Sequence, residues 1–277
     1  MSLLAVHAVG VGALAPDEPA VHADDEGFLR GRAVFETLRV YGGRPFRLDA
    51  HLERLRRSAA LLGLPEPDAA ALAQAGAAAL RDGGAPDAVL RFLWTPGREG
   101  GGPPTGLVLV SALPPGLEEL RARGLRLAVV PWAPGHRLAG SKSTSYAENL
   151  AARDEALRRG CDDALLVGAD GSVLEAPTAN AWLREGARLL TPSLEQPILA
   201  GVTRAALWEL AEAAGYVPEE GVVPLERAAA ADELFLSSSV REVMPVVRLD
   251  DAAVGDGAPG EAAQALQRAL RSLATAG

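Results

Sequence analysis

The chain has 277 residues, enough for one large domain or two domains of ordinary size. Hydrophobic residues make up 48% and charged residues 23%, proportions typical of a folded globular protein rather than a disordered one. The formal net charge of −9 argues against nucleic-acid binding and against attraction to a membrane surface. The single cysteine, Cys161, excludes an intrachain disulfide and a cysteine-based zinc site, so we expect a cytoplasmic protein.

The N-terminal part of the chain is expected to alternate strands and helices. Residues 1–15 lack the positively charged start of a targeting segment and are interpreted as an opening strand. Residues 32–41 are rich in β-branched and aromatic types, which favours a second strand. Asp49 stands where a helix N-cap is expected, directly before an amphipathic run. The other elements expected here are a helix over residues 68–81 and paired strands at 88–94 and 106–112.

A Pro-Pro-Gly sequence at residues 114–116 predicts the boundary between an N-terminal domain, 1–116, and a C-terminal domain, 117–277. In the second domain, Lys142 is expected on a connecting segment ahead of a helix. The other elements expected here are a strand at 125–131, hairpins over 164–175 and 181–191, a helix opening at Gly201, a strand at 233–236 and a helix over 261–274. This mixture predicts an α/β (α+β) fold in two parts.

Lysine usage is the most informative feature of the composition. The chain contains 26 arginines and one lysine, Lys142. A guanidinium stays protonated and cannot form a Schiff base, whereas a desolvated lysine amine can. Lys142 is therefore either a chance survivor of compositional bias or the Schiff-base residue of an aldolase or a pyridoxal phosphate (PLP) enzyme.

A PLP site also needs an anion cradle and an acid for the pyridine nitrogen. Residues 201–203 (Gly-Val-Thr) offer backbone N–H groups at a helix N-terminus, where the helix dipole favours an anion. The serines at 237–239 follow a strand and offer hydroxyls and amides, although both segments are also common structural motifs. Glu175 ends an apolar strand, so its carboxylate should face inward and pair with a pyridinium N–H or a structural arginine.

Taken together, these segments resemble the class IV (fold-type IV) PLP enzymes: branched-chain aminotransferases, D-amino acid aminotransferases and aminodeoxychorismate lyases. The resemblance covers nearly the whole chain. Its motifs are, in order, 31–39 (GRAVFETLR), 51–55 (HLERL), Lys142 with Tyr146, 175–180 (EAPTAN), 189–191 (LLT), 201–204 (GVTR) and the serines at 237–239. The family implies a smaller N-terminal α/β domain, a larger C-terminal domain, the cofactor in the cleft and a homodimer.

The resemblance also implies roles for individual residues. Lys142 would hold PLP as a Schiff base and shuttle a proton, and Glu175 would pair with the pyridine nitrogen. The implied cofactor-binding residues are Arg54, Lys142, Tyr146, Glu175, Asn180, Val202, Thr203, Ser238 and Ser239, with Arg54 on the phosphate. The implied substrate-binding residues are Phe35, Thr37, Arg39, Arg98 and Arg137, and any of the three arginines could meet the substrate carboxylate.

The expected function is transfer of an amino group between an amino acid and a 2-oxo acid, with a D-amino acid or (R)-amine favoured over a branched-chain L-amino acid. The alternative is 4-amino-4-deoxychorismate lyase activity, which releases pyruvate and 4-aminobenzoate. The subfamily stays open. The loop at 95–100 lacks the Arg-x-His of D-amino acid aminotransferases, and Thr37 follows Glu36 where branched-chain enzymes usually have glycine.

Two other classes of function are disfavoured. A non-catalytic binding protein on this fold should lack Lys142 or Glu175, and both are present. A metal hydrolase would need clustered ligands, and the histidines are scattered without ligand spacing. We interpret His51 as supporting the helix that carries Arg54.

Overall fold

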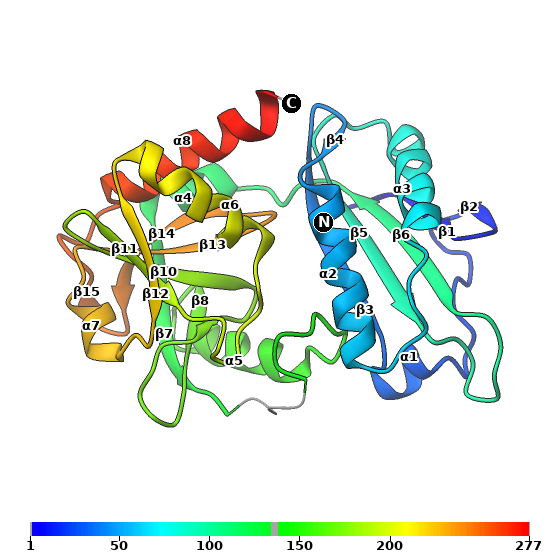
Figure 1. Cartoon of the computed structure of the whole chain (residues 1–277), viewed down its shortest axis with the longest axis horizontal. Helices are drawn as coiled ribbons and strands as arrows, with labels where there is room; N and C mark the ends of the chain where they lie inside the picture. Colours follow the sequence, from blue (N-terminus) through cyan, green and yellow to red (C-terminus); the bar gives the residue numbers. More distant parts are fainter. Residues whose placement is uncertain (1, 134–137, 277) are drawn as a thin grey trace. The chain divides into compact units, whose positions relative to one another are not determined.

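The computed structural model describes residues 2–133 and 138–276. The chain divides into two compact units, drawn in Figure 1. Unit 1 comprises Met1–Pro115 and Gly140–Tyr146, and unit 2 comprises Gly116–Ala139 and Ala147–Gly277. The segment around Lys142, which a boundary at residue 116 assigns to the second domain, therefore packs with unit 1.

Unit 1 is built on an antiparallel six-stranded sheet with the strand order β2-β1-β6-β5-β3-β4. Its strands are β1 Leu3–Ala8, β2 Gly12–Leu14, β3 Val34–Tyr41, β4 Arg44–Pro45, β5 Ala88–Thr95 and β6 Thr105–Ser111. Its helices are α1 Glu26–Arg30, α2 Leu48–Leu61 and α3 Ala69–Gly83. Apolar residues of α2 and α3, among them Leu55 and Leu72, bury one face of this sheet together with strand residues such as Phe92 of β5.

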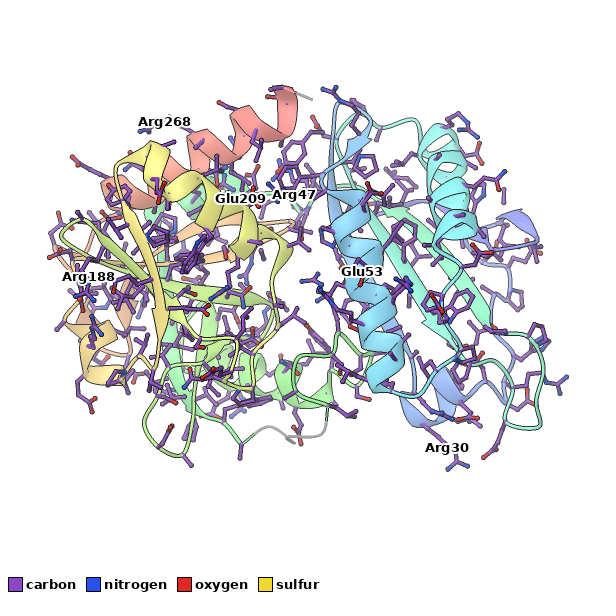
Figure 2. The ribbon with its side chains drawn as sticks, in the orientation of Figure 1. Arg30, Arg47, Glu53, Arg188, Glu209 and Arg268 are labelled. Atoms are coloured by element: carbon purple, nitrogen blue, oxygen red, sulfur yellow. The ribbon has the colours of Figure 1, made fainter. Side chains whose placement is uncertain are left out.

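Two local predictions in unit 1 are wrong. The opening segment forms a hairpin of two strands rather than one strand, because the chain reverses at Gly10, whose φ is 79°. Helix α2 begins at Leu48, and Asp49 lies in its first turn instead of capping it. Arg47, labelled in Figure 2, precedes the helix with φ 51°, a left-handed conformation. An acidic side chain in the first turn still interacts favourably with the helix dipole.

Strand β3 presents two different faces. Val34, Glu36 and Leu38 are buried toward the helices, whereas Phe35 and Thr37 on the opposite face are half-buried. This alternation follows from the two-residue period of a strand. Phe35 and Thr37, which the resemblance implies contact substrate, therefore share the face of β3 opposite the buried one.

Unit 2 contains a mixed nine-stranded sheet. The main path runs β12-β11-β10-β13-β14-β7-β8, with β9 paired to β10 and β15 paired to β14. The strands are β7 Leu125–Pro131, β8 Asp163–Val167, β9 Glu175–Ala176, β10 Ala179–Glu185, β11 Arg188–Pro192, β12 Val217–Gly221, β13 Glu233–Ser238, β14 Glu242–Leu249 and β15 Ala252–Ala253. The helices are α4 Leu117–Arg123, α5 Ala147–Arg158, α6 Val202–Ala211, the 3-10 turn η1 Glu212–Ala214, α7 Leu225–Ala229 and α8 Glu261–Ala276.

Both faces of this second sheet are covered. Leu127 and Leu165 belong to one buried cluster, and their neighbours Ala128 and Leu166 belong to another. The near-continuous apolar strands of the sequence reflect this double burial. The predicted mixed α/β fold is confirmed. In the part of the chain that the structure describes, no helix combines the length and hydropathy needed to cross a bilayer.

Candidate active site

The main chain of Lys142 is held by two elements of unit 1. Its N–H donates to Ser58 Oγ on α2 at 3.0 Å, and its carbonyl accepts from the N–H of Phe35 on β3 at 2.9 Å. The N–H of Thr144 donates to the carbonyl of Ala33 at 2.9 Å, so the segment continues alongside the start of β3. Lys142 lies ahead of α5, on a connecting segment as expected. Its position is set by hydrogen bonds on both of its peptide groups.

The side chain of Lys142 lies against two aromatic rings. Nζ is 4.4 Å from the ring centroid of Phe35 and donates to the hydroxyl of Tyr146 at 3.4 Å. The two rings meet edge to face with centroids 5.3 Å apart. Unit 1 thus brings together Lys142, Tyr146 and Phe35, three of the residues singled out in the sequence.

Glu36 lies next to Phe35 on β3, on the buried face of the strand, and forms an ion pair that was not expected from the sequence. Both carboxylate oxygens of Glu36 accept from Arg54, through Nε and Nη2, at 2.7 Å each. His51 Nδ1 lies 2.6 Å from the same carboxylate. Burial raises the pKa of Glu36, but the hydrogen bonds from Arg54 and His51 outweigh burial and lower that pKa to about 2.

The charge states of Glu36, Arg54 and His51 follow from their surroundings. Burial lowers the pKa of His51, against the opposing effect of its hydrogen bond to Glu36. A neutral His51 can still donate through Nδ1, so Glu36 and Arg54 carry the opposite charges at neutral pH. His51 and Arg54 share Glu36, which fits the expected support of Arg54 by His51. The sequence contained one signal for a buried partner of Glu36, because this acid occupies a strand position between apolar residues that face the core.

Arg91 is a second residue that sequence reasoning missed. It lies on β5 directly opposite Thr37, donates to the Thr37 hydroxyl at 3.3 Å, and places its guanidinium 5.8 Å from the Phe35 ring centroid. Burial lowers the pKa of Arg91, which is half-buried, and no carboxylate among the described residues pairs with it. The sequence signal is an arginine within the otherwise apolar run AVLRFLW.

The arginines expected to meet substrate lie in different places. Arg39 follows Thr37 by two residues on β3, and its guanidinium is 5.0 Å from the Tyr41 ring centroid. Arg98 is exposed and paired with Asp24 at 2.9 Å. Arg137 lies outside the described residues.

In unit 2, Glu175 and Asn180 are opposite each other on the paired strands β9 and β10. Glu175 Oε2 accepts from Asn180 Nδ2 at 3.1 Å and from the N–H of Leu199 at 3.2 Å. Asn180 Nδ2 also donates to the carbonyl of Leu199 at 2.8 Å. Both of these donors to Glu175 are amides. Such donors favour the ionised carboxylate.

Helix α6 starts directly beside this pair. Gly201 is its N-cap and supplies no side-chain cap, so the N–H groups of Val202 and Thr203 in the first turn have no partner within the helix. A Cβ on Gly201 would lie 2.0 Å from Asn180 Oδ1, so only glycine fits here. Unit 2 therefore brings together Glu175, Asn180 and the start of α6.

The serines lie on the neighbouring strand. Ser237 pairs across the sheet with Asn180, and its Oγ accepts from Trp182 Nε1 at 3.1 Å. Ser238 ends β13 and Ser239 begins the turn to β14, and both are half-buried. Ser237 is thus engaged within the core, and the two serines after it stand at the turn.

Comparison with known proteins defines the class. Residues 33–249 match the model of the family described as amino-transferase class IV, and the chain belongs to this family. A relative from Mycobacterium tuberculosis, named as a bifunctional aminodeoxychorismate lyase / D-amino acid transaminase, is 38% identical over 229 residues, covering 73% of this chain and 76% of the relative.

Solved structures agree with this assignment. The fold IV transaminase CpuTA1 from Curtobacterium pusillum has a TM-score of 0.89 and 36% identity, covering 98% of this chain and 99% of that one. A hypothetical aminotransferase from Mycobacterium tuberculosis, solved with α-ketoglutarate and PMP bound, has a TM-score of 0.92 and 31% identity, with 98% and 99% covered. The expected cofactor is confirmed: class IV aminotransferases use PLP, and that protein has also been solved with PLP bound.

Proposed function

We propose that this protein is an aminotransferase that binds PLP through Lys142 and exchanges amino groups between an amino acid and a 2-oxo acid. The observation that carries the proposal is the environment of its single lysine, held at both peptide groups and with its amine against Phe35 and Tyr146. When bound, PLP supplies an electron sink for the bond cleaved at the substrate carbon. Lys142 would supply the amine that anchors it, and would take the proton from that carbon and deliver it to the cofactor carbon that receives the amino group.

Glu175 is proposed to accept the N–H of the pyridine ring. Its carboxylate is supported by the amide of Asn180 and the N–H of Leu199, both of which favour the charged form. The N-terminus of α6 at Val202 and Thr203, with Ser238, Ser239 and Arg54, is proposed to bind the phosphate. The pairing of Arg54 with Glu36 holds its guanidinium in a fixed position.

Arg91 is proposed as a carboxylate-binding residue, alongside Arg39. A half-buried cation beside Phe35 and Thr37 would gain from a negatively charged ligand, because burial already disfavours its charge. The exposed pair between Arg98 and Asp24 makes Arg98 less suited to this role. The named relatives and the α-ketoglutarate form support a D-amino acid donor with a 2-oxo acid acceptor.

A second candidate function is 4-amino-4-deoxychorismate lyase activity, favoured by the name of the bifunctional relative. One experiment separates the two. Purified holoenzyme is mixed with D-alanine, L-leucine, L-glutamate or (R)-1-phenylethylamine without an acceptor, and its absorbance is followed. Conversion to the pyridoxamine form supports transfer. Release of pyruvate from aminodeoxychorismate without such conversion by any donor would favour the lyase instead.

We also propose a cytoplasmic homodimer, as expected from the resemblance to the family. Light scattering coupled to size-exclusion chromatography of the holoenzyme tests the oligomeric state. A mass near twice the 28.7 kDa of one chain is expected, and a monomer at micromolar concentration would contradict it.

A further inference from the structure

Glu242 occupies an unusual position at the first residue of β14. It pairs across the hairpin with Ser238, so only the turn residues 239–241 separate the two. Its φ of 59° lies in the left-handed region, which is costly for a residue with a side chain. Its side chain is nevertheless completely buried. Such a conformation persists only where surrounding contacts enforce it.

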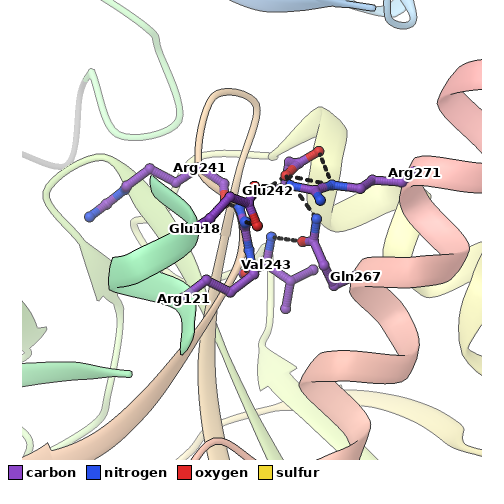
Figure 3. Close-up of polar contacts among 7 residues, drawn as sticks. All are labelled: Glu118, Arg121, Arg241, Glu242, Val243, Gln267 and Arg271. Atoms are coloured by element: carbon purple, nitrogen blue, oxygen red, sulfur yellow. Dashed lines mark hydrogen bonds and ion pairs between the residues drawn. The ribbon is translucent and has the colours of Figure 1, made fainter. Parts of the chain in front are cut away.

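The carboxylate of Glu242 is held by two helices. Arg121 of α4 donates to Oε2 at 2.9 Å. Gln267 and Arg271 of α8 donate to the same oxygen at 2.8 and 2.7 Å. Figure 3 shows these two side chains reaching from α8 toward Glu242. Charge-assisted hydrogen bonds of this kind are among the strongest in proteins, so the network can hold the strained residue.

Arg121 and Gln267 also form hydrogen bonds with the main chain next to Glu242. Arg121 donates to the carbonyls of Arg241 and Val243 at 2.9 and 3.0 Å. The N–H of Val243 donates to Gln267 Oε1 at 2.9 Å. Arg241, the last residue of the turn, pairs with Asp163 at 2.8 Å. The turn after Ser238 is thus fixed by its own residues and by α4 and α8.

Glu233, at the opposite end of the hairpin, provides an internal comparison. It is also a buried glutamate, paired with Arg184 at 2.7 Å, and it accepts from the N–H groups of Ala262 and Ala263 at the start of α8. Both glutamates therefore tie the β13–β14 hairpin to α8. Only Glu242 adjoins the serine turn.

We propose that Glu242 is a positioning residue, which fixes the β13–β14 turn so that Ser238 and Ser239 present their donors to the phosphate of PLP. This inference rests on the proposed function. A merely structural role would make Glu242 and Glu233 equivalent. A positioning role predicts that loss of the Glu242 carboxylate weakens the binding of a ligand that carries a phosphate group and not of one that lacks it.

The test compares Glu242→Gln with the control Glu233→Gln. Apoprotein is titrated with PLP and, separately, with pyridoxal, which lacks the phosphate, and the ratio of the two dissociation constants is measured. Glu242→Gln should weaken PLP binding about tenfold, the equivalent of one charge-assisted hydrogen bond, with little change for pyridoxal. Glu233→Gln should lower the thermal midpoint of the apoprotein and leave the ratio as in the wild type.

An unchanged ratio in Glu242→Gln would overturn the inference while leaving the proposed function intact. Wild-type protein that bound PLP no better than pyridoxal would instead overturn the phosphate site, and this inference with it. If Glu242→Gln fails to fold, Gln267→Ala provides the second variant, because it removes one donor to Glu242 and the acceptor for Val243. The same rise in the ratio is then expected, and its absence is contrary to the inference.

Discussion

The contacts that hold Lys142 in unit 1 and those that hold Glu175 in unit 2 are built in different ways. Lys142 is held by Ser58, 84 positions away, whereas Glu175 bonds to Asn180 five positions away and to Leu199 24 positions away. The first arrangement exists only once the fold has formed, and the second lies within the continuous stretch of chain from β9 to the loop after β11. A short motif can therefore fix the contacts of Glu175, whereas the contacts of Lys142 depend on tertiary packing.

The two regions also differ in their electrostatics. Unit 1 buries a charged pair, Glu36 with Arg54, next to His51. Around Glu175, unit 2 uses the neutral donors of Asn180 and Leu199. A buried ion pair responds strongly to the loss of one partner, because the other charge is left uncompensated. Loss of Glu36 is therefore expected to disturb folding, whereas loss of the Glu175 carboxylate is expected to disturb chemistry.

Replacement of Glu175 should have the largest effect, and this effect should fall on the amino-transfer rate rather than on folding. Glu175→Gln should leave folding and PLP binding nearly unchanged, because glutamine keeps the shape of the side chain and an oxygen that can accept from Asn180 and Leu199. The amino-transfer rate should fall about 10³-fold, since the pyridine nitrogen would lose its anionic partner. Single-turnover absorbance measurements with D-alanine check this. A rate equal to that of the wild type would remove Glu175 from the mechanism.

Replacement of Glu36 should affect stability instead. Glu36→Gln leaves the Arg54 guanidinium buried without its counter-charge, and we expect a loss of about 3 kcal/mol in the free energy of unfolding. The matched control is Glu53→Gln on the same helix, labelled in Figure 2, whose exposed pair with Arg56 should contribute about 0–1 kcal/mol. Urea unfolding of the apoproteins measures both. Equal losses would contradict the account of the buried pair.

The pH dependence of stability follows from the same carboxylate. The pKa of Glu36 is lowered to about 2, so its stabilisation is fully present above its ordinary pKa of 4.5. It is lost progressively as the pH falls from 4.5 toward 2. Wild-type protein should therefore lose stability more steeply than Glu36→Gln over this interval. Parallel curves for the two proteins would show that Glu36 is not the carboxylate responsible.

The smallest expected effect concerns Arg91, which belongs to unit 1 but is proposed to act on substrate. Arg91→Gln should raise KM for 2-oxoglutarate about tenfold, the loss of one charge-assisted contact, with a smaller change in kcat. Thermal unfolding should be almost unchanged, because no described carboxylate pairs with Arg91. A destabilised variant with an unaltered KM would assign Arg91 to folding.

Predictions that depend on neighbouring residues were more successful than those that depend on tertiary packing. The expected hairpin that became β10 and β11 is confirmed, as is the start of a helix at Gly201, because each depends on a few neighbouring residues. The helix N-cap at Asp49 was wrong, since the chain enters α2 through the left-handed residue Arg47. Nothing local in the sequence showed that Glu36 would engage Arg54. That pairing depends on how α2 packs against β3.

The packing of the segment around Lys142 with unit 1 could not be predicted either, because the hydrogen bonds between Lys142 and both Ser58 and Phe35 join parts of the chain that are far apart in sequence. That Lys142 is the Schiff-base residue stays a prediction, which rests on its being the single lysine of the sequence. The structure adds its surroundings, which composition could not supply.

The most direct test of the account is to reduce the holoenzyme with borohydride and map the attached pyridoxyl group by peptide mass spectrometry. The account predicts one modified site, Lys142, in the wild type and none in Lys142→Ala, because the chain has no other lysine. Labelling at another position, or an unmodified Lys142 in an active enzyme, would contradict it.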